Sequence, residues 1–251
     1  MKQYKAIFLD WDDTIGDFSN AAMRSLQWMY EHRGLNRCFD SFMRFYQIYE
    51  DHNIELWTRY GLDQVTKEYL EFDRMFFPLT RADHPFLLVK QLAIAQQMAA
   101  DHLRLTTRFF SLMPDAEEVI RYLAAKYPLV IVSNGFRSVQ YRKIERSGLR
   151  DCFKYVVLSE EVGCQKPNPH IYEVALDRGG WKPDEVLMIG DSWTSDIQGA
   201  IAAGIDQLWI NPNAASSLNS PPKLGGVPEG GGSVQSATYI VPRLRDVMNL
   251  L

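Results

Sequence analysis

Residues 7–14, IFLDWDDT, decide the fold of this chain. Their apolar beginning predicts a short buried strand, and Asp10, Asp12 and Asp13 follow it at once. Residues two apart on a strand share a face, so Asp10 and Asp12 would point the same way. Two carboxylates this close repel each other unless a divalent cation or a shared proton removes the penalty. A strand that ends in an ordinary polar turn would use the same residue types, so other parts of the chain must decide.

The composition is that of a globular protein with one large domain, or with a core and a smaller domain. Of its 251 residues, 46% are hydrophobic and 23% are charged. The net charge of −4 gives no global basic footprint, so we expect no nucleic-acid partner. Three cysteines without CxxC spacing argue against a disulfide framework or a structural zinc site. We also expect a cytoplasmic protein without a membrane partner, because no apolar run approaches the ~20 residues that span a bilayer and no signal region precedes the first strand.

The segment from Asp17 to about Phe110 carries helical signals and almost no strand signals. Residues that favour helix ends separate stretches in which apolar side chains recur at helical spacing. We expect most aromatic side chains here to pack between helices rather than to contact a ligand. The predicted helices span residues 20–34, 41–61, 63–78 and 85–105.

From Pro114 onward, predicted strands and helices alternate, and each strand is almost entirely apolar. Such strands form a parallel sheet that helices cover on both faces. Ligand sites of these sheets lie at the carboxyl ends of the strands, near the switch point, so we expect the N-terminal strand at the centre. The predicted strands span 129–132, 155–158, 186–189 and 207–210, and the predicted helices span 116–126, 138–147, 169–178 and 194–203.

The fold class that follows is α/β, with a Rossmann-like parallel sheet core and an inserted all-helical domain. The core would comprise residues 1–16 and 109–251, and the insert residues 17–108. Within the core, residues 213–236 are rich in Gly, Ser and Pro and predict a long loop before a last strand and helix.

Polar residues follow three further predicted strands. Ser133 can donate a hydrogen bond to a phosphate oxygen, and Gly135 permits a turn that exposes backbone N–H groups to an anion. Lys166 lies in a proline-stiffened loop and can act as a positive clamp. Asp191 ends a buried strand as a candidate metal ligand, and Asp196 could orient it or simply favour a helix N-terminus. Each cluster alone is compatible with an ordinary turn, but four of them at the carboxyl ends of parallel strands suit Mg²⁺ and a phosphoryl group.

The order of these stretches resembles the four motifs of the haloacid dehalogenase (HAD) superfamily of phosphohydrolases. The resemblance covers the core, and the helical insert resembles that superfamily's C1 cap. A narrower similarity, to the 5′-nucleotidase branch that acts on pyrimidine and noncanonical nucleoside monophosphates, rests on residues 133–136, 159–163 and 209–212. The chain departs from many relatives at Asp13, where they have glycine. The motifs here are Asp10-Trp11-Asp12-Asp13-Thr14, Ser133-Asn134, Lys166-Pro167, and Gly190-Asp191 with Asp196.

The resemblance implies a Mg²⁺-dependent phosphatase that acts on a small-molecule phosphomonoester, most specifically a nucleoside 5′-monophosphate. Asp10 would be the nucleophile and form an aspartyl-phosphate. Asp12 would be the general acid and then the general base. Asp10, the backbone carbonyl of Asp12, and Asp191 would hold the metal ion. Trp11 would face away from the acids and pack beneath the cap.

The same resemblance implies which residues hold the phosphoryl group. Ser133, the backbone amide of Asn134, and Lys166 would bind its oxygens, and Lys166 would take part in catalysis in this way. Asp196 would support the loop that carries Asp191, and Thr14 would have a supporting place in the first motif.

Two other functions use similar residues. A sugar-phosphate or phosphoglycolate phosphatase, or a phosphomutase, would share the whole core. A phospho-acceptor switch of the receiver-domain kind also uses Asp, Ser or Thr, Lys and Mg²⁺. The switch is disfavoured because the candidate nucleophile lies on the first strand, a second acid follows two residues later, and a large helical insert is present.

Overall fold

The computed structural model describes residues 2–214 and 237–251. It divides into two compact units, one formed by Met1–Asp17 with Leu112–Leu251 and the other by Phe18–Ser111. We predicted a loop over the Gly/Ser/Pro-rich residues 213–236. Of these, residues 215–236 are outside the described part of the chain. Among the described residues, no helix is long and apolar enough to cross a membrane.

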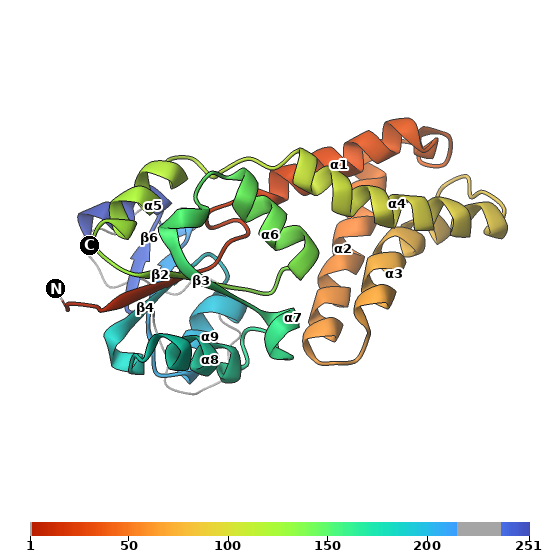
Figure 1. Ribbon diagram of the computed structural model, residues 1–251. Helices are drawn as coiled ribbons and strands as arrows, with labels where there is room; N and C mark the ends of the chain where they lie inside the picture. Colours follow the sequence, from red (N-terminus) through yellow and green to blue (C-terminus); the bar gives the residue numbers. More distant parts are fainter. Residues whose placement is uncertain (1, 215–236) are drawn as a thin grey trace. The chain divides into compact units, whose positions relative to one another are not determined.

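The first unit contains a six-stranded sheet in which every pair of neighbours is parallel, in the order β3-β2-β1-β4-β5-β6. The N-terminal strand lies inside the sheet, between β2 and β4, and the expected fold class is confirmed (Figure 1). The strands are apolar because both faces of the sheet are covered. They span β1 Ala6–Leu9, β2 Leu129–Ser133, β3 Phe153–Leu158, β4 Val186–Gly190, β5 Asp206–Ile210 and β6 Tyr239–Val241.

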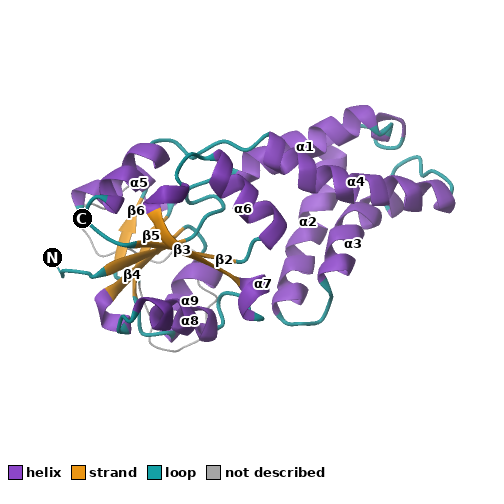
Figure 2. Ribbon diagram, in the orientation of Figure 1, coloured by secondary structure: helices purple, strands orange, loops and turns teal. Residues whose placement is uncertain are grey.

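Helices cover both faces of this sheet, with α5 and α6 on one side and α8 and α9 on the other (Figure 2). Phe8 of β1 and Val130 of β2 belong to a buried cluster that includes Ile171 and Tyr172 of α8 and Ala200 of α9. The sheet therefore positions its strand ends between two rigid layers. The helices span α5 Ala116–Ala124, α6 Arg137–Arg146, α7 Ser159–Val162, α8 Pro169–Gly179 and α9 Gln198–Ala202.

Three elements of this unit differ from the prediction. The expected helix over 194–203 is a π-helix, η4, over Trp193–Ile197, followed by the short α9. The short helix α7 was not predicted. The last helix is a 3₁₀-helix, η6, over Leu244–Asn249, with Leu244 and Val247 buried. A spacing of three residues between buried side chains matches the 3₁₀ repeat, which aligns positions i and i+3.

The second unit is helical, with its own hydrophobic core, and contains α1 Phe18–His32, η1 Leu35–Arg37, α2 Phe42–Gly61, α3 Lys67–Thr80 and α4 Leu88–Arg108. Many of its aromatic side chains lie in or against that core, as expected. The third helix was predicted to begin at Asp63 and to stop at Pro78. Asp63 instead has a left-handed backbone (φ 55°), and the side chain of Thr66 caps the helix by accepting from the Tyr69 N–H. Pro78 lies in the final turn of this helix, which ends two residues later, at Thr80.

Candidate active site

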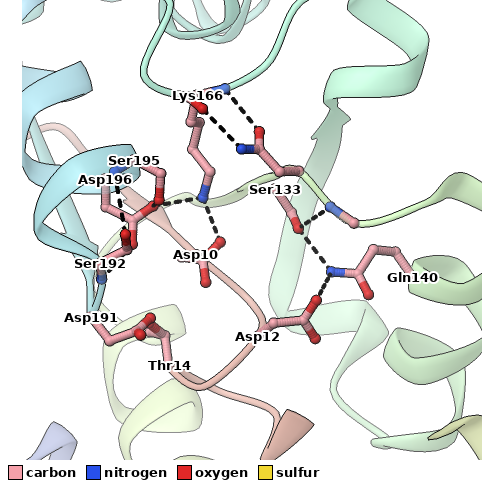
Figure 3. Close-up of polar contacts among 12 residues, drawn as sticks. Asp10, Asp12, Thr14, Ser133, Gln140, Lys166, Asp191, Ser192, Ser195 and Asp196 are labelled. Carbon is pink, nitrogen blue, oxygen red and sulfur yellow. Dashed lines mark hydrogen bonds and ion pairs between the residues drawn. The ribbon is translucent and has the colours of Figure 1, made fainter. Parts of the chain in front are cut away.

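The carboxyl ends of β1, β2 and β4 bring the predicted polar stretches to one edge of the sheet (Figure 3). The register pairs Leu9 with Ile131 of β2 and with Ile189 of β4. Asp10 follows Leu9, and its backbone N–H donates to the Ile189 carbonyl at 3.0 Å. Because parallel strands end at the same edge, residues far apart in the sequence converge around Asp10.

Lys166 lies between two carboxylates. Its Nζ donates to Asp10 Oδ1 at 2.5 Å and to Asp196 Oδ1 at 2.7 Å, and its side chain is only 2% exposed. Burial alone would lower the pKa of this ammonium group, but the two carboxylates raise the pKa above its ordinary value. Burial raises the pKa of the Asp10 carboxyl well above its usual range, although Lys166 opposes the change. The lysine therefore stays charged beside the predicted nucleophile.

Asp196 connects Lys166 to the loop that follows β4. Its Oδ2 accepts from the Ser192 N–H at 3.0 Å, while its Oδ1 accepts from Lys166. Gly190 permits this approach, because a Cβ at that position would lie 2.3 Å from Asp196 Oδ2. The Tyr172 hydroxyl donates to the backbone carbonyl of Asp196 at 3.2 Å. Protein donors thus engage both carboxylate oxygens of Asp196.

Asp191 follows β4 and is fixed at its side chain and at its backbone. Thr14 Oγ1 donates to Asp191 Oδ1 at 2.8 Å, and Trp209 Nε1 donates to the Asp191 carbonyl at 2.8 Å. Burial, followed by the charge of Asp196, raises the pKa of the Asp191 carboxyl to about 7, and the hydrogen bond from Thr14 opposes this in part. Thr14 and Asp191, which lie in the first and last predicted motifs, are therefore in direct contact.

Ser133 and Asn134 occupy the end of β2 and organise the centre of the site. Ser133 Oγ accepts from the Gly135 N–H at 3.1 Å and from Gln140 Nε2 at 2.8 Å, which leaves its hydroxyl proton as the group that can be donated to a ligand. The side chain of Asn134 pairs reciprocally with the backbone of Lys166, at 2.8 and 2.9 Å. The motif alone predicts a role only for the backbone of Asn134, whereas in the structure its side-chain amide also fixes the backbone of Lys166.

Two side chains of the site were missed. Gln140 and Lys143 of α6 both contact Asp12: Gln140 Nε2 lies 3.0 Å from Oδ2, and Lys143 Nζ lies 2.7 Å from Oδ1. Val139, Gln140, Lys143 and Ile144 are the buried residues of this helix. A glutamine and a lysine three residues apart on the apolar face of a predicted helix were the signal that could have found them.

The charge balance of the site fits a divalent cation. If all four carboxyls are ionised, Asp10, Asp12, Asp191 and Asp196 carry four negative charges against the two positive charges of Lys143 and Lys166. Two negative charges then remain among these six side chains, and a divalent cation would balance them. Carboxylate oxygens of Asp10, Asp191 and Asp196 lie within 4.8 Å of one another. Oxygen donors of this kind suit Mg²⁺. Because both oxygens of Asp196 are engaged, Asp10 and Asp191 offer the better-placed ligands.

Besides Asp12, two residues lie between Asp10 and Thr14: Trp11 and Asp13. The charge of Asp13 contributes to the raised pKa of Asp191. Asp13 has a left-handed backbone, with φ 62°, which a short polar side chain tolerates in a turn. Trp11 is fully buried, and its ring meets Phe153 of β3 edge to face, with centroids 6.1 Å apart. The contact with Phe153 lies within the α/β unit, and the packing of Trp11 beneath the helical insert stays a prediction.

The chain is similar to known proteins in sequence and in fold. The sequence model of a hydrolase family described as haloacid dehalogenase-like hydrolase matches residues 4–204. Pyrimidine 5′-nucleotidase YjjG of Escherichia coli (strain K12) is 31% identical over 214 residues, which cover 82% of this chain and 85% of YjjG. A glyceraldehyde 3-phosphate phosphatase of Methanothermobacter thermautotrophicus is 32% identical over 210 residues, with 82% and 85% coverage. A crystal structure of the HAD-hydrolase YfnB from Bacillus subtilis, bound to magnesium, superposes with a TM-score of 0.80 and 25% identity over 99% of both chains.

Proposed function

Because the chain belongs to the haloacid dehalogenase-like hydrolase family, we propose that it is a Mg²⁺-dependent phosphatase that acts through an aspartyl-phosphate on Asp10. The observation that carries the proposal is the contact of Lys166 with Asp10, in a site where a second acid, Asp12, follows two residues later. A nucleophilic carboxylate beside a fixed positive charge is the arrangement that an attack on an anionic phosphoryl group requires.

In the first half of the proposed reaction, a carboxylate oxygen of Asp10 attacks phosphorus, and the bond from phosphorus to the ester oxygen breaks. Asp12 gives its proton to the departing alcohol. In the second half, Asp12 takes a proton from water, the water oxygen attacks phosphorus, and the acyl-phosphate bond to Asp10 breaks to release phosphate. Proton transfer of this kind is typically worth ~10²–10⁴-fold in rate.

The remaining groups bind the phosphoryl oxygens and the metal. Ser133, the backbone N–H of Asn134, and Lys166 would donate to the phosphoryl oxygens. Asp10, the backbone carbonyl of Asp12, and Asp191 would hold Mg²⁺, which when bound offsets the repulsion between the carboxylate nucleophile and the phosphoryl group. Thr14 and Asp196 support Asp191 and Lys166 through the hydrogen bonds described above.

The preferred substrate within this proposal is a nucleoside 5′-monophosphate with a pyrimidine or noncanonical base. Similarity to YjjG supports it. A sugar-phosphate substrate is the second candidate, and similarity to glyceraldehyde 3-phosphate phosphatase supports that one. The proposal keeps the predicted division into a catalytic core, residues 1–16 and 109–251, and a helical cap, residues 17–108, to which it assigns the choice of leaving group.

The test is phosphate release from dUMP, dTMP, UMP, glyceraldehyde 3-phosphate and phosphoglycolate, each with Mg²⁺ and with EDTA. We expect Mg²⁺-dependent turnover that is highest on the pyrimidine nucleotides. Asp10→Asn should lower kcat by at least ~10³-fold, since it removes the nucleophile. Asp13→Asn is the matched control, because asparagine tolerates the left-handed backbone at that position, and it should keep nearly full activity.

Other outcomes have definite meanings. Substantial activity of Asp10→Asn would contradict the covalent mechanism. Faster turnover of the sugar phosphate or of phosphoglycolate would select the second candidate. A phospho-aspartate that persists for minutes without turnover would instead indicate a phospho-acceptor switch.

A further inference from the structure

The acid Asp12 is held from one side by two buried side chains of α6. Lys143 Nζ lies 2.7 Å from Asp12 Oδ1, and Gln140 Nε2 lies 3.0 Å from Oδ2. Each oxygen of the carboxylate therefore accepts from its own donor and keeps a second lone-pair site on which a proton can be carried. Both donors come from the same helix (Gln140 is shown in Figure 3). Two separate hydrogen bonds from one rigid element fix both the position and the plane of a carboxylate.

The burial of Lys143 separates this pair from an ordinary surface ion pair. The Lys143 side chain is 3% exposed, while that of Asp12 is 25% exposed. Arg142, the residue before Lys143 on the same helix, is exposed. Burying an ammonium group costs free energy unless a well-placed carboxylate compensates, so this lysine does not serve solubility. The partly open side of Asp12 is then the side that a ligand can reach.

Gln140 joins the acid to the predicted phosphate-binding serine. Its Nε2 donates both to Asp12 and to Ser133 Oγ, the latter at 2.8 Å. The opposite amide orientation would place a carbonyl oxygen against the Asp12 carboxylate, so the donor assignment is determined by the network. Gly135 makes room for this side chain, because a Cβ there would lie 2.4 Å from Gln140 Cδ. The acid and the serine are thus held by one amide nitrogen.

We propose that Lys143 and Gln140 are positioning residues that hold Asp12 in the orientation for proton transfer to the leaving alcohol. This inference rests on the proposed phosphatase function and adds to it the two residues through which α6 acts. Neither residue needs to touch the substrate, because both act through the Asp12 carboxylate. Replacing either residue should therefore lower kcat/KM most for substrates whose leaving group needs a proton from Asp12.

The leaving group provides a direct test. A nucleotide or sugar phosphate expels an alcohol that needs a proton, whereas p-nitrophenyl phosphate expels a stable phenolate that does not. The ratio kcat/KM covers the steps through loss of the leaving group, so it isolates the acid role of Asp12. We compare Lys143→Met with Arg142→Met, which removes an exposed cation from the same helix.

Lys143→Met should lower kcat/KM by at least ~10-fold on the best alkyl phosphate and by less than ~3-fold on p-nitrophenyl phosphate. Arg142→Met should leave both ratios within ~2-fold of the wild-type values. In an Asp12→Asn background, Lys143→Met should cause no further selective loss, because the group through which it acts is already gone. Gln140→Met keeps the side-chain length but removes the donor. If Lys143→Met does not fold, Gln140→Met should show the same selective loss of kcat/KM on the alkyl substrate.

Two failures can be told apart. Wild-type protein that releases no phosphate from any ester with Mg²⁺ would overturn the proposed function, and the positioning role with it. An active wild type whose variants lose activity equally on both substrates, or whose Lys143→Met loss persists in the Asp12→Asn background, would overturn the positioning role alone.

Discussion

At the scale of single residues, the site is dominated by carboxylates that are costly to bury near one another. Burial raises the pKa of Asp10 well above its usual range and the pKa of Asp191 to about 7. Lys166 compensates the charge of Asp10 directly, whereas the side-chain donor to Asp191 within the described part of the chain is a neutral group, the hydroxyl of Thr14. In the metal-free protein, the ionised Asp191 carboxylate therefore lowers the free energy of unfolding, and a bound cation would raise it again.

The variant Asp191→Asn should stabilise the metal-free protein at pH 8. The folded-state pKa of Asp191 is raised above its unfolded value, so its favourable contribution exists at low pH and is lost as the pH rises through 7. Removing the charge should add about 1–3 kcal/mol, or about 2–4 °C in Tm per kcal/mol. The gain should shrink at pH 5, where the folded wild type is already protonated, as thermal denaturation in EDTA would measure.

The same variant should lose the rise in Tm that Mg²⁺ gives to the wild type, because it removes a proposed ligand. Asp13→Asn is again the control and should keep that rise. An Asp191→Asn protein that is less stable without metal, and that Mg²⁺ still stabilises, would contradict both the electrostatic account and the ligand assignment.

At the scale of elements, the loop between β4 and α9 is wound as a π-helix rather than an α-helix. The wide turn of η4 is held from α8, where the hydroxyl of the fully buried Tyr172 donates to the carbonyls of Ser195 and Asp196 at 2.9 and 3.2 Å. π-Turns occur often at functional sites. Here the turn carries Asp196 to Lys166, so the shape of one short element places a charge beside the proposed nucleophile.

Tyr172→Phe should cost about 1–3 kcal/mol in the free energy of unfolding, because the carbonyls of Ser195 and Asp196 lose the hydroxyl donor that they share. It should also weaken Mg²⁺ binding, since the turn that follows Asp191 loosens. Urea denaturation and a titration of Mg²⁺ against Tm measure the two effects.

The matched control is Tyr155→Phe in β3, whose hydroxyl donates to the Ala175 carbonyl at 2.6 Å, away from η4. It should lower stability by a similar amount and leave Mg²⁺ binding unchanged. Equal weakening of Mg²⁺ binding in both variants would show that the effect is general destabilisation rather than a role of the turn.

At the scale of the whole molecule, the chain forms two units with separate hydrophobic cores. Phe45 of α2 is fully buried in the helical unit, and its ring lies within 6.4 Å of the rings of Phe39 and Tyr49. Each core is made of contacts within its own unit. A substitution in one core should therefore lower the stability of that unit first.

Phe45→Ala should destabilise the helical unit by about 3–5 kcal/mol, since a large buried ring is replaced by a cavity. Hydrogen exchange should speed up across residues 18–111 while β1, β2 and β4 stay protected. Met43→Ala on the same helix, at a side chain that is 60% exposed, is the control and should change little. Uniform acceleration through both units would indicate that they unfold as one cooperative body.

The sequence predicted most of the sheet because its short apolar runs alternate with predicted helices, and that alternation is typical of a parallel sheet covered on both faces. It also placed Asp10, Ser133, Lys166 and Asp191 near one edge, because parallel strands must end together. The sequence did not predict features that depend on the three-dimensional arrangement of the chain. The left-handed backbone of Asp63 and the π-turn of η4 leave no periodic pattern to read, and Gln140 and Lys143 look like ordinary helix residues until the helix is docked.

What the sequence by itself determined is therefore the kind of fold and the inventory of charged groups at the strand ends. Those follow from local patterns, the alternation of apolar strands with helices and the acids that end the first and fourth strands. The tertiary structure alone decided which charges meet. Lys166 pairs with Asp10 and Asp196, while Lys143 pairs with Asp12. The physical reason is that an ion pair depends on distances of a few ångströms between side chains, and only the packing of α6 and of the loops against the sheet sets those distances.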